Sequence, residues 1–264
     1  IKTKPGKINI VPRNITNYID SKRTMYRHLT KENIPFYLPK TYTRMENVDK
    51  NIFDGEKLFF LKTYHGSGGK AVTCSNNYEK FDKILKEKGT TDFILQEEIE
   101  NPLLDEGRKF SLRVYVLLAD KNIYVHRDIL GIIHKEKYDK SNPDNKIHVS
   151  HRNVIYFNLK NKNYFKFFFD KIRHISYHSL NQFVCDKDTQ NKCMVFGFDF
   201  IIDQKFDPYL IEINHYPNFG YDVDLEHQIK KNMFYDLVTL YIEPKILKTP
   251  VREGDWVLCT PSLK

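Results

Sequence analysis

Runs of apolar residues bounded by polar and glycine-rich segments predict strands in the first half of the chain. Residues 57–63, KLFFLKT, are typical of a buried strand, and the loop YHGSGGK at 64–70 separates them from a return strand, AVTC, at 71–74. DFILQEEI at 92–99 predicts a strand of about five residues that runs into a polar hinge. These segments together predict a small antiparallel sheet built around a glycine loop.

Two longer hairpins are predicted further along the chain. KFSLRVYVLLA at 109–119 and NIYVHRDILGII at 122–133 are strand-like and are separated by a short turn at Asp120 to Asn122. At 196–214, two alternating runs flank a polar break near Gln204 to Phe206. The polar segment 135–153 contains a proline and is expected to be a mobile loop over a site.

Apolar residues at three- and four-residue spacing predict helices between the strands. The first helix has an N-cap candidate in Asp20 or Ser21 and ends before Pro35, and the second follows Asn76 or Asn77 and ends at Gly89. Two further helices are predicted at about 164–183 and 225–237. Because hairpins and helices are mixed without strict strand–helix alternation, the pattern favours an antiparallel α+β fold over a doubly wound parallel sheet.

Composition narrows the class of protein but not its partner. The chain has 264 residues, of which 41% are hydrophobic, so it can bury a sizeable core. Its net charge of +8 favours an acidic partner, although the general abundance of Lys, Asn, Ile, Tyr and Phe explains the excess equally well. Four cysteines without C-x-x-C spacing indicate a reduced, cytoplasmic protein.

Neither a membrane span nor a signal peptide is expected, because no stretch approaches about 18 consecutive apolar residues. The chain begins at Ile1 rather than at a methionine. Its start is therefore compatible with a trimmed sequence, and a targeting segment upstream of it stays an open alternative.

The loop GSGGKA resembles two familiar nucleotide-binding motifs, and the context argues against both. A P-loop needs a glycine where Tyr64 stands and a hydroxyl where Ala71 stands. The dinucleotide fingerprint fits the spacing of Gly66, Gly68 and Ala71, but it must open a helix, whereas a strand is predicted here. These two labels are therefore set aside.

Two interpretations of the glycine loop remain. It is either an ordinary flexible hairpin turn or a flap whose backbone N–H groups close over phosphates, since glycine has no Cβ to block their approach. Lys62 before the loop and Lys70 after it would bring ammonium charges to a phosphate chain. The flanking lysines favour the phosphate-binding flap.

The hairpin at 196–214 carries oxygen-bearing side chains in an apolar setting. Glu212 and Asn214 share one face of their strand, and the turn brings Asp199 opposite Glu212. Carboxylate and amide oxygens suit Mg²⁺ or Mn²⁺, and Mg²⁺ commonly completes its coordination with phosphates and water. The alternative is a solvated sheet face on which these acids neutralise nearby lysines, but the flanking Phe and Ile residues favour a metal site that also carries a nucleotide.

The order of these motifs resembles the ATP-grasp superfamily, and most closely its tubulin tyrosine ligase-like family. The resemblance covers about residues 57–218 and is carried by four stretches: LFFLKTYHGSGGKAV, ILQEEIENPLLDEGRKFSLRVYVLL, FGFDFIID and YLIEINHYPN. It implies an ATP-grasp fold in which two mainly antiparallel sheets hold ATP. It also implies joining of a carboxylate to an amine through an acylphosphate, with release of ADP and phosphate.

The same resemblance implies roles for individual residues of this chain. Lys109 and Arg113 match a basic pair and, with Glu212, are the expected catalytic residues. The expected metal ligands are Asp199, Glu212 and Asn214. The expected nucleotide contacts are Lys62, Gly68, Gly69, Lys70, the hinge residues Gln96, Glu97, Glu98 and Ile99, and Lys109.

Departures from the family pattern cluster where the acceptor or the amino acid is expected to bind. Ser111 replaces an aspartate, and Ile132 stands where a second arginine is expected after Arg127. Ser150 and His151 replace Thr and Asn in an H-L-T-N element. Arg127, Ser150 and His151 are therefore candidate substrate residues, and the substrate of this chain is open.

The expected function is ATP-dependent addition of an amino acid to an acidic protein or peptide carboxylate. The alternatives are a peptide ligase for small molecules and a nucleotide- or nucleic-acid-binding module without turnover. Membrane partners are not expected, and a nucleic-acid partner is disfavoured because the aromatic residues mostly fall at core-like spacings. The expected division is a lead-in at 1–56, a glycine-flap subdomain at 57–100, a catalytic subdomain at 101–248 and a tail at 249–264.

Overall fold

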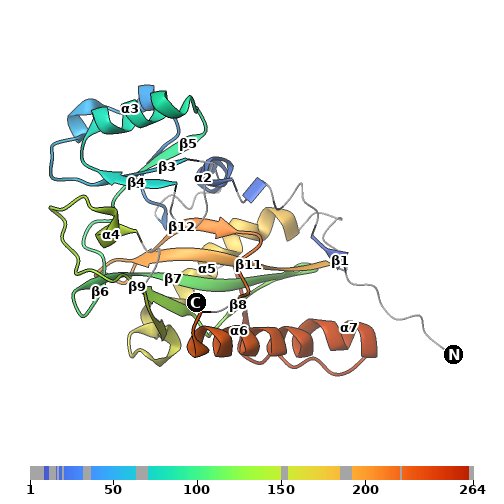
Figure 1. Cartoon of the computed structure of the whole chain (residues 1–264). Coiled ribbons are helices and arrows are strands. Elements are labelled where there is room, and N and C mark those ends of the chain that lie inside the picture. The colour runs from blue at the N-terminus through green and yellow to red at the C-terminus, as the bar shows by residue number, and fades with distance from the viewer. Residues whose placement is uncertain are drawn as a thin grey trace.

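The structure is a computed structural model, and two β-sheets facing each other form its framework (Figure 1). It describes residues 9–11, 16, 18–19, 21–31, 37–63, 71–149, 154–184, 192–220 and 222–261.

The small sheet forms from the strands predicted around the glycine loop. Its strand order in the described residues is β2 (Thr41–Tyr42), β5 (Phe93–Glu97), β3 (Phe59–Thr63) and β4 (Val72–Ser75), all antiparallel. Alternate residues of β3 are buried, as expected for a strand with one face covered. Residues 64–70, which join β3 to β4, lie outside the described residues.

One helix, α3 (Tyr78–Lys88), covers the apolar face of the small sheet (Figure 1). Its buried Phe81 packs in one cluster with Phe59 and Leu95 of the sheet. The predicted ends of this helix are confirmed. The Asn77 side chain accepts a hydrogen bond from the Lys80 N–H at 3.1 Å, and Gly89 ends the helix with φ +57°, a conformation that favours glycine.

The large sheet has nine strands in the described part of the chain. Its main path runs β1-β11-β7-β8-β13, while β12 pairs with β11, β6 and β9 pair with β7, and β10 pairs with β9. Every pair is antiparallel except β1 with β11. The strands are β1 (Asn9–Ile10), β6 (Leu104–Asp105), β7 (Arg108–Ala119), β8 (Asn122–His126), β9 (Leu130–Ile133), β10 (Ile155–Asn158), β11 (Lys192–Ile202), β12 (Pro208–Asn214) and β13 (Trp256–Leu258). The predicted antiparallel α+β class is confirmed.

Both predicted hairpins form, and one of them differs in detail. The β7–β8 turn lies at Asp120, whose φ is +54°, as predicted. The stretch expected as one strand at 122–133 divides into β8 and β9, because Asp128 at the break is buried and accepts hydrogen bonds from Asn158 and Asn232. These bonds hold the chain away from the ladder for three residues before β9 resumes pairing with β7.

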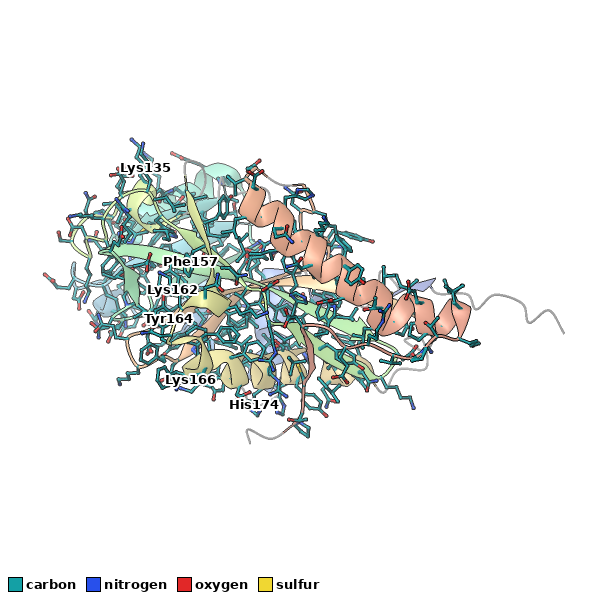
Figure 2. All side chains as sticks on the ribbon, turned by 90° about the horizontal axis from the view of Figure 1, so that it is seen from below. Lys135, Phe157, Lys162, Tyr164, Lys166 and His174 are labelled. Carbon is teal, nitrogen blue, oxygen red and sulfur yellow. The ribbon has the colours of Figure 1, made fainter. Side chains whose placement is uncertain are left out.

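Helices cover both faces of the large sheet. From one face of β7, Leu112 and Val114 pack against α5 (Phe165–Val184). From the opposite face, Tyr115 and Leu117 pack against α6 (Asp224–Leu237). Figure 2 shows α5 from its first turn at Lys166 past His174, with α6 and α7 along the other side of the molecule. The predicted helices at 164–183 and 225–237 therefore form within a residue or two of their expected bounds.

The remaining helices are short or connect the layers. A π-helical segment, η6 (Val238–Ile242), joins α6 to α7 (Glu243–Leu247). The segment 135–153, expected as a mobile loop, contains the one-turn helix α4 (Asn145–His148), and its residues 150–153 lie outside the described residues. Short turns are η2 (Met45–Asn47), η3 (Lys50–Ile52) and η4 (Leu159–Asn161). No helix in the described residues is long and apolar enough to cross a bilayer.

The arrangement leaves one part of the large sheet facing the small sheet. Lys109, Ser111 and Arg113 lie at alternate positions in the first half of β7 and line a cavity between the sheets, beyond the part that α6 covers. The helix α2 (Lys22–Lys31) lies between the sheets (Figure 1), and its Lys22 lines this cavity. The division of the chain into four segments stays a proposal, although β2 of the lead-in pairs with β5 and β13 of the tail pairs with β8.

Candidate active site

A cavity of about 370 Å³ lies between the two sheets, and residues from both sheets line it. Lys62 and Gln96 reach it from the small sheet, and Arg113, Asp199 and Glu212 reach it from the large sheet. The cavity is therefore bounded by most of the described residues that the sequence singles out.

A row of charged side chains crosses three neighbouring strands of the large sheet. Arg113 of β7 pairs with Asp199 of β11, which in turn pairs with Glu212 of β12. Residues directly opposite each other in antiparallel strands point to the same face, so all three side chains project into the cavity. The predicted opposition of Asp199 and Glu212 is thus confirmed by the register of the hairpin. The register shifts directly after this pair, because Phe200 pairs with Leu210 and leaves Ile211 of β12 as the extra residue of a bulge.

Each carboxylate of this row faces a cation of the chain. Arg113 Nε lies 2.5 Å from Asp199 Oδ1 and Nη2 lies 3.0 Å from Oδ2, a two-pronged arrangement that fits guanidinium to carboxylate. Lys22 of α2 places its Nζ 3.0 Å from Glu212 Oε1. Gly197 makes room for this geometry, because a Cβ there would lie 3.0 Å from Arg113 Cδ and 2.9 Å from the Pro217 ring.

The donor set fits a hard divalent ion in its chemistry. Asp199, Glu212 and Asn214 offer only oxygen donors once the Asn214 amide turns, and its Nδ2 now lies 3.4 Å from Asp199 Oδ2. No group of three or more His, Cys, Asp or Glu side chains within the described ranges is placed to hold a metal. The candidate set therefore depends on the amide of Asn214 as its third member.

Burial shapes the electrostatics of the cavity. Burial raises the pKa of Asp199, the Arg113 guanidinium opposes this, and the neighbouring Glu212 raises the pKa further. Burial alone would lower the pKa of Arg113, but the Asp199 carboxylate raises it above its ordinary value. Burial lowers the pKa of Lys62 to about 8, with partial compensation from Glu212. At neutral pH the Lys62 ammonium is still mostly protonated and faces the row of charges.

Most hinge side chains are already engaged by the protein. Gln96 donates to Thr41 Oγ1 at 3.0 Å, and Glu97 contacts the Lys57 ammonium at 2.5 Å and the Tyr42 hydroxyl at 2.8 Å. The side-chain carboxylate of Glu98 lies 2.9 Å from Lys109 Nζ.

Two hinge N–H groups are also occupied. The Glu97 and Glu98 N–H groups donate to the carbonyls of Lys40 and Leu58 at 2.8 and 2.9 Å. Ile99, the last residue of the hinge, lines the cavity together with Gln96 and Glu97.

Some expected site residues are not brought to the cavity or cannot be placed. Arg127 is exposed at the break between β8 and β9, its guanidinium lies 5.4 Å from the ring centre of Phe169, and it does not line the cavity. Gly68, Gly69, Lys70, Ser150 and His151 lie outside the described residues. Their roles, like those of the placed residues, stay predictions.

The structure also brings in residues that sequence reasoning missed. Lys22 comes from a helix about 190 positions away from its partner Glu212, and no local pattern marks it among the many lysines of the chain. His148, Val149 and Tyr156 line the cavity from the segment around α4 and from β10. The polarity of that segment predicts a loop over a site but does not say which side chains face inward.

Comparison with known proteins shows which family and which fold this chain is similar to. The model of the tubulin-tyrosine ligase family matches residues 3–164 and 158–250. Among curated proteins, the tubulin polyglutamylase TTLL7 of Mus musculus is 25% identical over 280 residues, covering 88% of this chain and 30% of its own length. Tubulin glycylase 3C of Tetrahymena thermophila is 27% identical over 222 residues, covering 71% of this chain and 21% of its own length.

Among solved structures, the C-terminal domain of Pby1 from K. lactis, described as an ATP-grasp enzyme interacting with the mRNA decapping enzyme Dcp2, is similar with a TM-score of 0.65. The two share 19% identity, and the match covers 97% of this chain and 81% of that one. The expected ATP-grasp fold is thereby confirmed. The chain spans less than a third of the length of the two curated relatives, so their activities do not transfer to it directly.

Proposed function

The chain belongs to the tubulin-tyrosine ligase family, and from that premise we propose that it is an ATP-dependent carboxylate–amine ligase. It would phosphorylate a carboxylate with ATP and let an amine displace phosphate from the acylphosphate, which forms an amide bond and releases ADP and phosphate. The observation that carries the proposal is the row Arg113–Asp199–Glu212, which faces Lys62 across the cavity.

The residues of the chain have distinct tasks in this proposal. Lys62 brings positive charge to the phosphate chain, and Arg113 orients Asp199 and stabilises negative charge on the transferring oxygens. A divalent ion, Mg²⁺ or Mn²⁺, held by Asp199, Glu212 and Asn214 would supply further charge neutralisation. No nucleophilic side chain is needed, because both reacting groups belong to the substrates. Catalysis then rests on positioning and electrostatics.

The acceptor and the amino acid are the finer part of the proposal. The names of the relatives point to an amino acid as one substrate and a protein such as tubulin as the acceptor. We propose the cytoplasm as the place of action. An acidic acceptor would suit the net charge of +8. The small-molecule peptide ligase and the non-catalytic binding module remain the alternatives.

Product mass separates these candidates. The chain is incubated with ATP, Mg²⁺, mixed free amino acids and a glutamate-rich peptide, and intact mass is read together with phosphate release. A mass increase of one or more amino acids on the peptide supports the protein ligase. Phosphate release with products only among the free amino acids supports the small-molecule ligase. If neither phosphate nor product appears, the ligase proposal fails.

Substitution of the candidate metal ligand tests the mechanism. Glu212→Gln keeps the side-chain volume but removes one charge, and we expect turnover to fall roughly 10²- to 10³-fold with little change in melting temperature. Glu253→Gln, an exposed glutamate outside the cavity, is the matched control and should leave turnover unchanged. Unchanged turnover in both Glu212→Gln and Asp199→Asn would remove the proposed site.

A further inference from the structure

The side chain of Asn145 makes hydrogen bonds to the backbone of β4, at the edge of the small sheet. Asn145 Oδ1 accepts a hydrogen bond from the Cys74 N–H at 2.7 Å, and its Nδ2 donates to the Val72 carbonyl at 2.8 Å. In the described residues β4 pairs with β3 on its other side only. Backbone groups two residues apart point to the same edge of a strand, so Val72 and Cys74 offer the acceptor and the donor that a fifth strand would take.

The amide of Asn145 reproduces what a neighbouring strand would provide. A primary amide offers one donor and one acceptor in a plane, as a peptide group does, so one side chain satisfies both backbone groups. A carboxylate could accept from Cys74 but could not donate to Val72. Alanine could do neither. The geometry therefore depends on an amide at position 145.

The helix that carries Asn145 is fixed to the large sheet and to the hinge. His134, which directly follows β9, donates its N–H to the Lys109 carbonyl at 2.8 Å, and its Nδ1 donates to the Ile147 carbonyl at 2.9 Å. His148 Nδ1 lies 3.4 Å from Glu98 Oε1 of the hinge. Figure 1 shows α4 directly below β4, between the two sheets. Asn145 thus links an anchored element of one sheet to the free edge of the other.

This link lies at the cavity. Val72 lines the cavity and pairs with Lys62 on β3, while His148 and Val149 line it beside α4. We propose that Asn145 is a positioning residue for nucleotide binding. It fixes β4 and Lys62 against the large sheet and thereby raises the affinity for the phosphate groups of the nucleotide. The inference rests on the proposed function, because it presumes that this cavity takes a nucleotide.

A purely structural role makes a different prediction. If Asn145 only protected the edge of the small sheet, its loss would lower the stability of the fold and would weaken the binding of every nucleotide equally. If Asn145 acts by positioning Lys62, its loss weakens the binding of a triphosphate much more than that of a monophosphate. The hinge that would meet the base is held by other contacts and is not affected. Nucleotides that differ only in phosphate number therefore distinguish the two roles.

The test compares Asn145→Ala and Asn145→Asp with Lys146→Ala, an exposed neighbour on the same helix. Binding of adenosine 5′-(β,γ-imido)triphosphate and of AMP, each with Mg²⁺, is measured by isothermal titration calorimetry, and folding is checked by melting temperature. We expect both Asn145 variants to bind the triphosphate about tenfold more weakly, the equivalent of one or two hydrogen bonds, with AMP affinity changed less than about twofold. Lys146→Ala should match the wild type.

Three outcomes decide the matter. Wild-type affinity for the triphosphate in both Asn145 variants, or an equal loss for AMP and the triphosphate, overturns the positioning role while leaving the proposed function intact. Failure of the wild-type chain to bind either nucleotide overturns the proposed function and this inference with it. If the alanine variant does not fold, Asn145→Asp, which keeps the acceptor for Cys74, carries the test alone.

Discussion

Replacing Glu98 by glutamine would leave the ammonium of Lys109 buried without its anionic partner. The two side chains are 4% and 1% exposed, and Glu98 Oε1 lies 2.9 Å from Lys109 Nζ. The ring centres of Phe60 and Tyr138 lie 5.1 and 5.8 Å from the ammonium and offer only weaker cation–π stabilisation. A buried charge in such a setting depends on its ion pair.

The expected loss of stability follows from this burial. Removing one partner of a buried ion pair typically costs about 3–5 kcal/mol, and the glutamine amide oxygen can still accept the hydrogen bond, so we expect about 3 kcal/mol. In a chain of this size each kcal/mol corresponds to about 2–4 °C, so the melting temperature should fall by about 6–12 °C at pH 7. The matched control is Glu100→Gln, at an exposed position two residues further along the chain. It should change the melting temperature by less than about 2 °C.

The same pair gives a pH dependence with a definite sign. Burial alone would raise the pKa of Glu98, but His148 and Lys109 outweigh it and hold the pKa below its ordinary value. A carboxyl with a lowered folded-state pKa stabilises the fold above its unfolded pKa of about 4.3, and this contribution is lost as pH falls through the folded-state pKa. The difference between wild type and Glu98→Gln should therefore narrow below about pH 4.

Thermal unfolding followed by circular dichroism at pH 7 and pH 3.5 measures both effects. The double variant Glu98→Gln/Lys109→Met removes the orphaned charge as well, and we expect it to be more stable than Glu98→Gln alone. The reasoning is refuted if Glu98→Gln melts within about 1 °C of the wild type at pH 7. It is equally refuted if the double variant loses the sum of the two single losses.

Three further predictions concern other parts of the molecule. Arg127→Ala should change ATP turnover by less than about twofold and lower the free energy of unfolding by about 0.5–1 kcal/mol, because Arg127 lies over the Phe169 ring outside the cavity. A tenfold loss of turnover would instead support a role for Arg127 in substrate binding. Chelation of divalent ions with EDTA should abolish turnover, and added Mg²⁺ or Mn²⁺ should restore it in the wild type; turnover that persists in EDTA would contradict the metal site. Asn77→Ala should remove the cap of α3 and lower the melting temperature by about 2–4 °C, while Asn77→Asp, which also accepts from the Lys80 N–H, should not.

The sequence predicts those parts of the site that depend on local rules. Side chains alternate on a strand, and a short turn sets the register of a hairpin, so the opposition of Asp199 and Glu212 follows from residues fewer than 20 positions apart. Caps such as Asn77 and Gly89 are local in the same sense. The local rules do not predict the shift in register directly after Asp199, because the bulge there has no signal in the pattern.

The rest of the site could not be predicted, because it depends on contacts between distant segments. Lys22 meets Glu212 across about 190 positions, and Asn145 meets Val72 across about 70. Arg127 is a different case. The family resemblance makes it a candidate substrate residue, but the structure places it against Phe169 of α5 rather than at the cavity. Burial of Asp128 among Asn158 and Asn232 is decided by packing that a single sequence does not display.

The balance of charge in the cavity explains why these distant contacts matter for function. Among the described lining residues, Lys109 is neutralised by Glu98 and Glu97 by Lys57, which leaves Lys22, Lys62 and Arg113 facing the carboxylates of Asp199 and Glu212. Two carboxylates alone would repel a triphosphate, and the cations of the chain offset that repulsion before any ligand arrives. In the proposed mechanism Asp199 and Glu212 would hold a divalent ion, and Lys22, Lys62 and Arg113 would then be available to the phosphates. The strands thus supply the carboxylates, and contacts between distant segments supply the counter-charges that the proposed nucleotide site requires.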